Sequence, residues 1–288
     1  MLETENHSNP KALLQKEFDK TRNLFVFLVH LIHQVALYAE KEAQQRASKN
    51  LPDQSDLTFN IKIAGNTLVW QTIESENYKK AFEIVKPYQW LEGDIVKTLF
   101  RHLSDTPTYA TYISEESRDK NKEREILKFI FGTIILESQN TVDYIDEHFT
   151  NWEDEGDVMI GFVLNYLQKP SQVDFLDLVG DEKNKFAIDL LNTAIEKKTI
   201  TEDIIKPKLN NWDPERIAMI DMILLRLGVC ELLYFDTIPT KVTINEYIDL
   251  GKEYSTEQSG HFVNGILDNI HKELISTGKI QKISHKNQ

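Results

Sequence analysis

The segment IPTKVTINEYIDLGKEYSTEQSGHFVNGILDNI, residues 238–270, decides the fold because it predicts two helices joined by a very short turn. Pro239 opens the first helix, and Lys252 lies in its last turn, where a cation suits the helix dipole. Ser255 and Gln258 form an S-x-x-Q capping box that starts the second helix. The sequence therefore predicts a helical hairpin in this part of the chain.

Both helices of this hairpin carry apolar residues that can face a core. We expect the apolar side of the first helix to consist of Val242, Ile244, Ile248 and Leu250. The buried stripe of the second helix recurs every four residues, at Phe262, Ile266, Ile270 and Leu274. Gly265 lies inside this uninterrupted stripe, so we expect it to mark a close helix contact rather than a hairpin turn. Such a glycine costs ~1 kcal/mol relative to alanine.

Four motifs follow one another in the C-terminal part of the chain. They are WDPERI at residues 212–217, LLRLGVCELL at 224–233, KVTINEYIDLGKEYS at 241–255 and SGHFVNGILD at 259–268. In this order and spacing they resemble the C-terminal signature of the NusB family of bacterial transcription antitermination factors. The resemblance covers roughly residues 183–278. Because so long a region precedes it, the chain resembles enlarged members of that family with additional N-terminal helices.

Helical spacing dominates the whole chain, which contains only 11 glycines and 8 prolines. We expect a long helix over residues 11–47 and a loop or helix entry, rather than a strand, over 58–64. Shorter helices are predicted near residues 78–85, 91–103, 123–137, 142–149, 157–167, 183–198 and 201–209. The segment from Pro214 to Phe235 is apolar nearly all round, which is typical of a central buried helix.

The resemblance implies an all-α fold of two packed helical bundles, with extra N-terminal helices ahead of them. We place the boundary in the loop near residue 170. Residues 1–170 then form a helical N-terminal region with little family pattern, and residues 171–288 form the NusB-like domain. After about residue 278 the chain turns basic, and we expect this tail to be disordered.

Composition and motifs favour a soluble binding protein over an enzyme. The sequence contains no phosphate-binding loop, no dinucleotide fingerprint and no zinc-protease or nucleophile-elbow motif, so we expect no catalytic residue and no cofactor. The single cysteine, Cys230, excludes a cysteine-based zinc cluster. His30 and His33 lie three residues apart, where a packed pair is favoured over a metal site. The apolar stretch over residues 24–39 is shorter than the ~20 residues of a membrane span, and a cytoplasmic location follows.

The resemblance also implies partners. Family members bind NusE, a ribosomal protein, and the pair recognises boxA RNA and acts on the RNA polymerase elongation complex. Phe262 and Asn264 match positions that lie toward the RNA-binding side of family members. For Phe262 two alternatives remain: its ring either stacks on a base or packs in the core. Ser259 and His261 surround a helix start that favours phosphate. The corresponding protein-partner positions are Asp221 and Gln258.

The chain departs from the family at its N-terminus. The family's arginine-rich first helix supplies RNA contacts, whereas here four acidic and four basic residues balance one another within residues 1–23, and the net charge of the chain is −13. Either the true start lies upstream of Met1, or RNA binding is weakened or moved. One alternative is a protein-only scaffold that has lost RNA binding. Another is a module related to the non-catalytic N-terminal domain of RNA cytosine methyltransferases. We disfavour a self-contained enzyme of that kind, because it would need nucleophilic cysteines and this sequence contains only Cys230.

Overall fold

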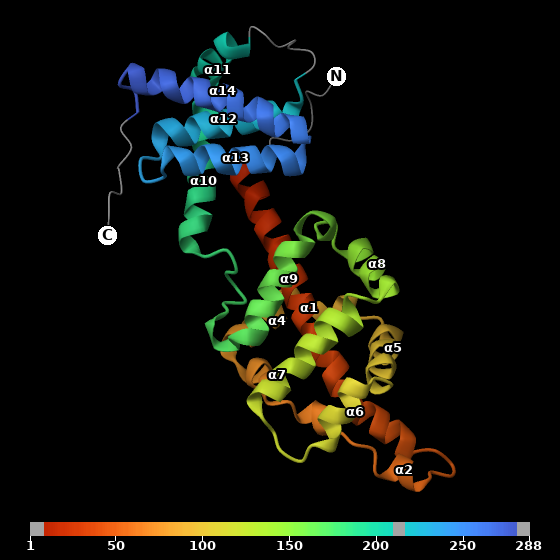
Figure 1. Cartoon of the computed structure of the whole chain (residues 1–288). Coiled ribbons are helices and arrows are strands. Elements are labelled where there is room, and N and C mark those ends of the chain that lie inside the picture. The colour runs from red at the N-terminus through yellow and green to blue at the C-terminus, as the bar shows by residue number, and fades with distance from the viewer. Residues whose placement is uncertain (1–8, 210–216, 281–288) are drawn as a thin grey trace. The chain divides into compact units, whose positions relative to one another are not determined.

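The computed structural model describes residues 9–209 and 217–280. The chain divides into two compact units, one made of residues 12–180 and the other of residues 1–11 and 181–288. Every regular element in the described ranges is helical, so the all-α prediction is confirmed (Figure 1).

The unit of residues 12–180 is built around α1, Pro10–Ala47. The elements that follow are α2 (Gln54–Leu57), η1 (Lys62–Gly65), α3 (Thr67–Glu74), α4 (Glu76–Val85), η2 (Pro87–Trp90), α5 (Gly93–Ser104), α6 (Pro107–Ser114), α7 (Lys120–Phe129), η3 (Ile130–Ile135), α8 (Gln139–His148), α9 (Trp152–Gln168) and η4 (Pro170–Gln172). The segment over residues 58–64 enters a short helix, as expected. Helices α2, α3 and α6 were not predicted from the sequence.

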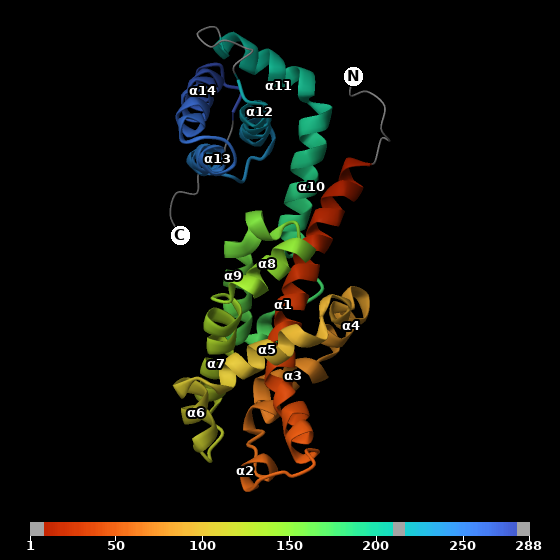
Figure 2. The same ribbon diagram turned by 90° about the vertical axis from the view of Figure 1, so that its right-hand side faces the viewer.

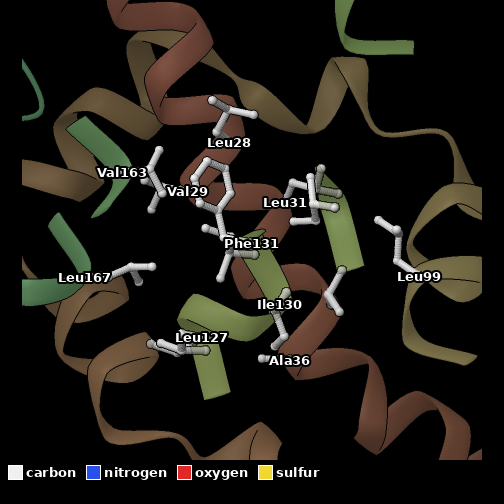
Figure 3. Packing of buried hydrophobic residues seen from close by; sticks show 14 of the residues in the cluster. Leu28, Val29, Leu31, Ala36, Leu99, Leu127, Ile130, Phe131, Val163 and Leu167 are labelled. Carbon is white, nitrogen blue, oxygen red and sulfur yellow. The ribbon is translucent and has the colours of Figure 1, made fainter. Parts of the chain in front are cut away.

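The middle of α1, residues 24–39, is buried except at Gln34 and Leu37, which are half-buried. Leu28 and Leu31 are fully buried and pack in one cluster with Phe131 of η3, Leu99 of α5 and Val163 of α9 (Figure 3). The helix is long and apolar enough to cross a membrane, but 78% of its most apolar window is buried inside the protein. Its composition is therefore explained by its place in the core of this unit.

Two histidines of α1 belong to this core. His33 Nε2 lies 2.9 Å from the hydroxyl of Tyr166, and His30 Nδ1 lies 3.4 Å from the hydroxyl of Tyr78. Burial lowers the pKa of His30 to about 4. Burial, with repulsion from His30, lowers the pKa of His33 to about 3. Both imidazoles are therefore neutral in the folded protein at neutral pH.

This neutrality predicts a loss of stability in acid. Below pH 6.5 the unfolded chain binds protons on both histidines while the folded chain excludes them until about pH 4. Each histidine then removes about 1.4 kcal/mol per pH unit as the pH falls. Urea unfolding between pH 7 and pH 4.5 should give a shallower pH slope for His33→Gln, by about one proton. An unchanged slope would mean that His33 is protonated in the folded state.

The unit of residues 1–11 and 181–288 contains the NusB-like segment. Its elements are α10 (Asp181–Glu196), α11 (Lys198–Ile205), η5 (Lys206–Leu209), α12 (Met219–Tyr234), α13 (Thr240–Tyr254) and α14 (Glu257–Ser276). Its core includes Leu225 and Val229 of α12, Tyr247 of α13, and Val263 and Leu267 of α14. The tail expected after about residue 278 falls mostly on residues 281–288, outside the described ranges.

The central helix of this unit is shorter and more one-sided than the sequence predicts. Helix α12 begins at Met219, and the start that the sequence predicts at Pro214 lies outside the described residues. Leu225 is fully buried, but Met219 is 80% exposed and Ile223 is 44% exposed. The prediction of burial all round was wrong for the first turns, because hydrophobicity alone does not tell a buried face from an uncovered one.

The hairpin of α13 and α14 forms with different caps and a different α13 face. Thr256, not Ser255, accepts the backbone N–H of Ser259 and caps α14. Pro239 lies at the N-cap of α13, one position before its first helical residue. The buried residues of α13 are Thr243, Tyr247 and Gly251, whereas Val242 is 46% exposed. The stripe predicted for α14 is confirmed, because Phe262, Ile266, Ile270 and Leu274 are all buried.

The close contact between these helices involves other glycines than the one predicted. Gly265 is exposed, and a Cβ atom there would meet nothing within 4 Å. A Cβ on Gly251 would lie 3.4 Å from the backbone N of Gly260. A Cβ on Gly260 would lie 2.7 Å from Cγ of Lys252 and 3.3 Å from the carbonyl oxygen of Ile248. The backbones therefore approach at Gly251 and Gly260, and the prediction for Gly265 was wrong.

Substituting the two α14 glycines should have opposite effects on stability. Gly260→Ala should destabilise the protein by about 1–3 kcal/mol, because the added methyl overpacks the helix contact. Gly265→Ala should stabilise it by about 0.4–1 kcal/mol, because alanine restricts the unfolded chain and fits an exposed helix. Urea denaturation of the two variants measures this difference. Equal effects would show that α13 and α14 are not in close contact.

Candidate partner and RNA interface

The predicted site residues gather around the start of α14, where the hairpin turn meets α12. Ser259 Oγ donates to Asp221 Oδ2 at 3.0 Å. The hydroxyls of Ser255 and Thr256 each lie 2.9 Å from the same Ser259 oxygen. Three hydroxyls and one carboxylate thus link α12, α13 and α14 at this corner of the unit.

Asp221 is only 6% exposed, so its carboxylate does not stand free on the surface as its position in the sequence suggested. It lies in the first turn of α12, where an anion suits the helix dipole. Its Oδ1 is buried and has no hydrogen-bond partner among the described residues. A buried carboxylate oxygen without a donor costs free energy, so Asp221 is a polar group held in the core at this corner.

The exposed side of α14 carries three of the predicted residues. Gln258, His261 and Asn264 are exposed and recur at spacings of three, which places them on one face of the helix. Further along the same face, Asp268 accepts from Lys272 at 2.6 Å. This face offers amide and imidazole groups to a ligand, and it also carries the exposed carboxylate of Glu257 in the first turn of the helix.

Phe262 and Ser259 differ from these three residues because both are buried. Phe262 is 6% exposed and belongs to the core cluster with Val263 and Leu267. A ring buried in this way has no free face for a base, so of the two alternatives for Phe262 the structure favours packing. Ser259 is 5% exposed and serves the cap and the Asp221 contact. The structure therefore brings the predicted residues together but exposes only Gln258, His261 and Asn264.

A second buried carboxylate, that of Glu231, joins α12 to α13. The sequence marks Glu231 as a charge on an apolar helix that needs a partner on another helix, for which Lys241 was the candidate. Thr243 donates its hydroxyl to Glu231 Oε1 at 2.6 Å, and Tyr247 donates its hydroxyl to Glu231 Oε2 at 3.3 Å. Burial and the Glu231 carboxylate raise the pKa of Tyr247 well above its usual value. The available signal was the four-residue spacing of Thr243 and Tyr247, which puts two donors on one face.

In the described ranges, no three His, Cys, Asp or Glu side chains are grouped so that they could hold a metal ion. Cys230 is buried, and burial raises the pKa of its thiol to about 11, so the thiol is protonated at neutral pH. The described residues define the class of protein as all-helical, with a polar face at the start of α14.

Comparison with known proteins identifies the family. Residues 150–272 match the NusB family model. A transcription antitermination protein NusB from Methylacidiphilum infernorum is 43% identical over 103 residues, which are 35% of this chain and 72% of that relative. One from Listeria monocytogenes is 38% identical over 97 residues, or 34% of this chain and 76% of the relative. The chain therefore belongs to the NusB family.

The likeness to these relatives is confined to part of the molecule. A NusB protein from Chloroherpeton thalassium is 41% identical over 107 residues, but these are only 51% of its length and 37% of this chain. The family match begins at residue 150, earlier than the resemblance seen from residue 183, and so takes in α9 as well as α10–α14. Helices α1–α8 precede it. No solved structure matches the chain.

Proposed function

We propose that this protein is a transcription antitermination factor, which binds a NusE-type ribosomal protein and, together with it, boxA-like RNA. The observation that carries the proposal is the match to relatives that are named transcription antitermination proteins, at 38–43% identity. In this function the protein works in the cytoplasm and reaches the RNA polymerase elongation complex through the partner and the RNA. It acts by binding and catalyses no reaction.

We assign the protein partner to the corner formed by Asp221 and Gln258. Asp221 has a buried oxygen without a donor, and Gln258 lies exposed beside it at the start of α14. Because this oxygen is buried, we expect Asp221 to act by fixing the start of α14 through Ser259, while Gln258 makes the direct contact with the partner. RNA is assigned to the neighbouring His261 and Asn264 face, with Ser259 and Phe262 supporting the helix from behind.

Calorimetry and co-elution with the purified NusE-type protein of the same organism test the partner assignment. Asp221→Asn keeps the shape of the side chain and an acceptor for Ser259, so the fold should survive. Binding should weaken about tenfold, because a neutral amide holds Ser259 and the start of α14 less firmly than the carboxylate, and hydrogen bonds to charged groups contribute about 1.5–3 kcal/mol. If Asp221→Asn binds the NusE-type protein with unchanged affinity, Asp221 does not contribute to the interface.

A boxA oligonucleotide titration tests the RNA assignment. RNA alone should bind weakly, because a chain with a net charge of −13 offers few phosphate contacts, and the partner should tighten it. The double variant His261→Ala/Asn264→Ala should lose about tenfold in RNA affinity in the presence of the partner. Asn269→Ala, an exposed amide about 140° around the same helix from Asn264, is the matched control. Equal losses in both variants would place RNA elsewhere.

The second candidate, a protein-only scaffold, is favoured by the charge balance at the start of α1. Glu17 pairs with Lys20 at 2.8 Å, and Asp19 pairs with Arg22 at 3.0 Å. These ion pairs occupy cations that would otherwise face phosphate. Partner binding without any gain in RNA affinity would support this candidate.

A further inference from the structure

A pocket of about 450 Å³ lies beside the middle of α1, in the part of the chain that precedes the family match. Its lining comes from α1, α3 and α4, which all belong to the unit built around α1. Figure 2 shows α3 and α4 beside the middle of α1. The volume lies within the range of about 300–1,000 Å³ that is usual for small-molecule sites, so the pocket has room for a ligand of two or three fused rings.

Two polar side chains from the apolar middle of α1 line this pocket. Within the described ranges, His30 Nε2 and the Gln34 amide form no hydrogen bond, and neither group is sealed from solvent. They lie four residues apart, so they occupy one face of α1. The neighbouring His33 differs, because its Nε2 bonds to the Tyr166 hydroxyl at 2.9 Å. A ligand that displaces water from the pocket must therefore satisfy His30 and Gln34, or lose affinity.

The tautomer of His30 decides which hydrogen bond a ligand must make with it. The Tyr78 hydroxyl is buried, and among the described residues its one hydrogen-bond partner is His30 Nδ1, at 3.4 Å. A buried hydroxyl needs an acceptor, so Tyr78 donates to Nδ1 and the ring hydrogen of the neutral imidazole lies on Nε2. Burial lowers the pKa of His30 to about 4, which keeps the ring neutral at neutral pH. His30 Nε2 is then a donor, and the pocket favours a ligand with an acceptor.

Aromatic side chains form much of the pocket wall. Trp70 is 41% exposed, and its Nε1 donates to the carbonyl oxygen of Ala64 at 2.8 Å, which holds the indole in place. Phe82 lies half-buried on α4, with its ring centroid 5.2 Å from that of His30. Rings held in this way favour a planar aromatic ligand, which they can meet face to face or edge to face.

The charged residues of the lining balance one another. They are Lys79 and Glu83 of α4, one cation and one anion, and Lys79 also pairs with Glu76 at 2.9 Å. An ionised ligand would leave water for a lining without a net charge of the opposite sign, which costs free energy. The pocket therefore fits an uncharged ligand better than an anion or a cation.

We propose that this pocket binds a small, uncharged and planar heterocycle, which lies against Trp70 and Phe82. The ligand accepts a hydrogen bond from His30 Nε2 and forms another with the Gln34 amide, which can donate and accept. Helices α1, α3 and α4 then form a small-molecule site outside the family-matched residues 150–272. The inference does not depend on the proposed function, because it involves neither the protein partner nor RNA and uses no residue of α14.

The test titrates the full-length protein with 2-quinolinone, an uncharged bicyclic lactam that offers an acceptor and a donor. Calorimetry should show one saturable site. Trp70→Ala should raise the Kd about tenfold because the ligand loses an aromatic wall, and Trp70→Phe should restore most of the affinity. Gln34→Leu should raise the Kd about fivefold, because leucine is of similar size but cannot form the hydrogen bond.

The matched controls are a second ligand and a second glutamine. Naphthalene has the same two fused rings without a polar atom, so Gln34→Leu should not weaken its binding. Gln44→Leu removes an exposed glutamine of α1 outside the pocket, so it should leave the Kd for 2-quinolinone unchanged. Urea denaturation of each variant shows whether it is folded, and Gln34→Leu keeps the test open if Trp70→Ala does not fold.

Absence of saturable 2-quinolinone binding would overturn the inference, as would equal losses in Gln34→Leu and Gln44→Leu. If Trp70→Ala leaves the Kd for 2-quinolinone unchanged but abolishes binding of the NusE-type protein, the pocket is a protein-docking site and the inference is wrong. The two proposals fail separately. A protein that binds its partner but no 2-quinolinone contradicts only this inference. Binding of 2-quinolinone that depends on Trp70 and Gln34, without partner binding, contradicts only the proposed function.

Discussion

Leu225→Ala should lower the free energy of unfolding by about 2–5 kcal/mol, the usual range for a buried leucine cut back to alanine. Leu225 is fully buried in α12 and belongs to the core that α12 shares with α13 and α14. The loss combines the transfer free energy of the removed atoms with the cavity that remains, because a close-packed core relaxes only in part. Chemical denaturation measures it directly.

The control for Leu225 lies in the same unit. Ile275→Ala removes an aliphatic side chain that is 57% exposed near the end of α14, and it should change stability by less than about 0.5 kcal/mol. A loss under about 1 kcal/mol for Leu225→Ala would place that side of α12 at the surface. The face of α12 that packs in the core with α13 and α14 would then have been assigned wrongly.

Glu123→Ala should destabilise the unit of residues 12–180 by about 2–5 kcal/mol, because it removes a buried carboxylate that accepts hydrogen bonds from three donors. Glu123 is 1% exposed. Its carboxylate accepts from the backbone N–H of Thr67 at 2.7 Å, from the Tyr112 hydroxyl at 2.8 Å and from Arg118 at 3.4 Å. The change removes the charged group that ties α3 and α6 to α7. Urea unfolding, followed by tryptophan fluorescence, measures the effect.

The matched control for Glu123 is its neighbour Glu125. That carboxylate pairs with Lys128 at 3.2 Å but is 66% exposed, so Glu125→Ala should cost no more than about 1 kcal/mol. Similar effects for the two alanine variants would mean that Glu123 is open to solvent. The contacts from α3 and α6 would then be absent.

The sequence predicted those elements whose burial follows from apolar spacing. The stripe from Phe262 to Leu274 repeats every four residues, and the long helix over residues 11–47 carries enough apolar residues to form a core. The buried face of α13 could not be found in the same way. Thr243 is buried because it reaches Glu231, and Gly251 because α14 comes close, and both reasons arise from tertiary contacts.

Short helices were missed for a related reason. Helix α3 has eight residues, and its start is held by the side chain of Asn66 and by Glu123, which lies far along the chain. Such a helix is marginal by itself and depends on packing. Helix α6 did carry a local signal, since Thr106 caps it and Pro107 occupies its first position.

The candidate site was located by resemblance rather than by physical pattern. Asp221 and Ser259 lie 38 positions apart in the sequence, yet a hydrogen bond joins them in the structure. Exposure could not be inferred from sequence, because Phe262 and Asn264 differ only in which side of one helix they occupy. That difference now separates the residues that can touch a ligand from those that support the helix.

Calorimetric titration of the full-length protein with the NusE-type ribosomal protein of its own organism tests the central claim most directly. We expect saturable binding without RNA, and a boxA oligonucleotide added afterwards should bind more tightly than it does to this protein alone. The reason for this expectation is that the proposed partner would supply positive charge, which a chain with a net charge of −13 lacks. Absence of heat and of co-elution with that partner would contradict the assignment of this protein as an antitermination factor.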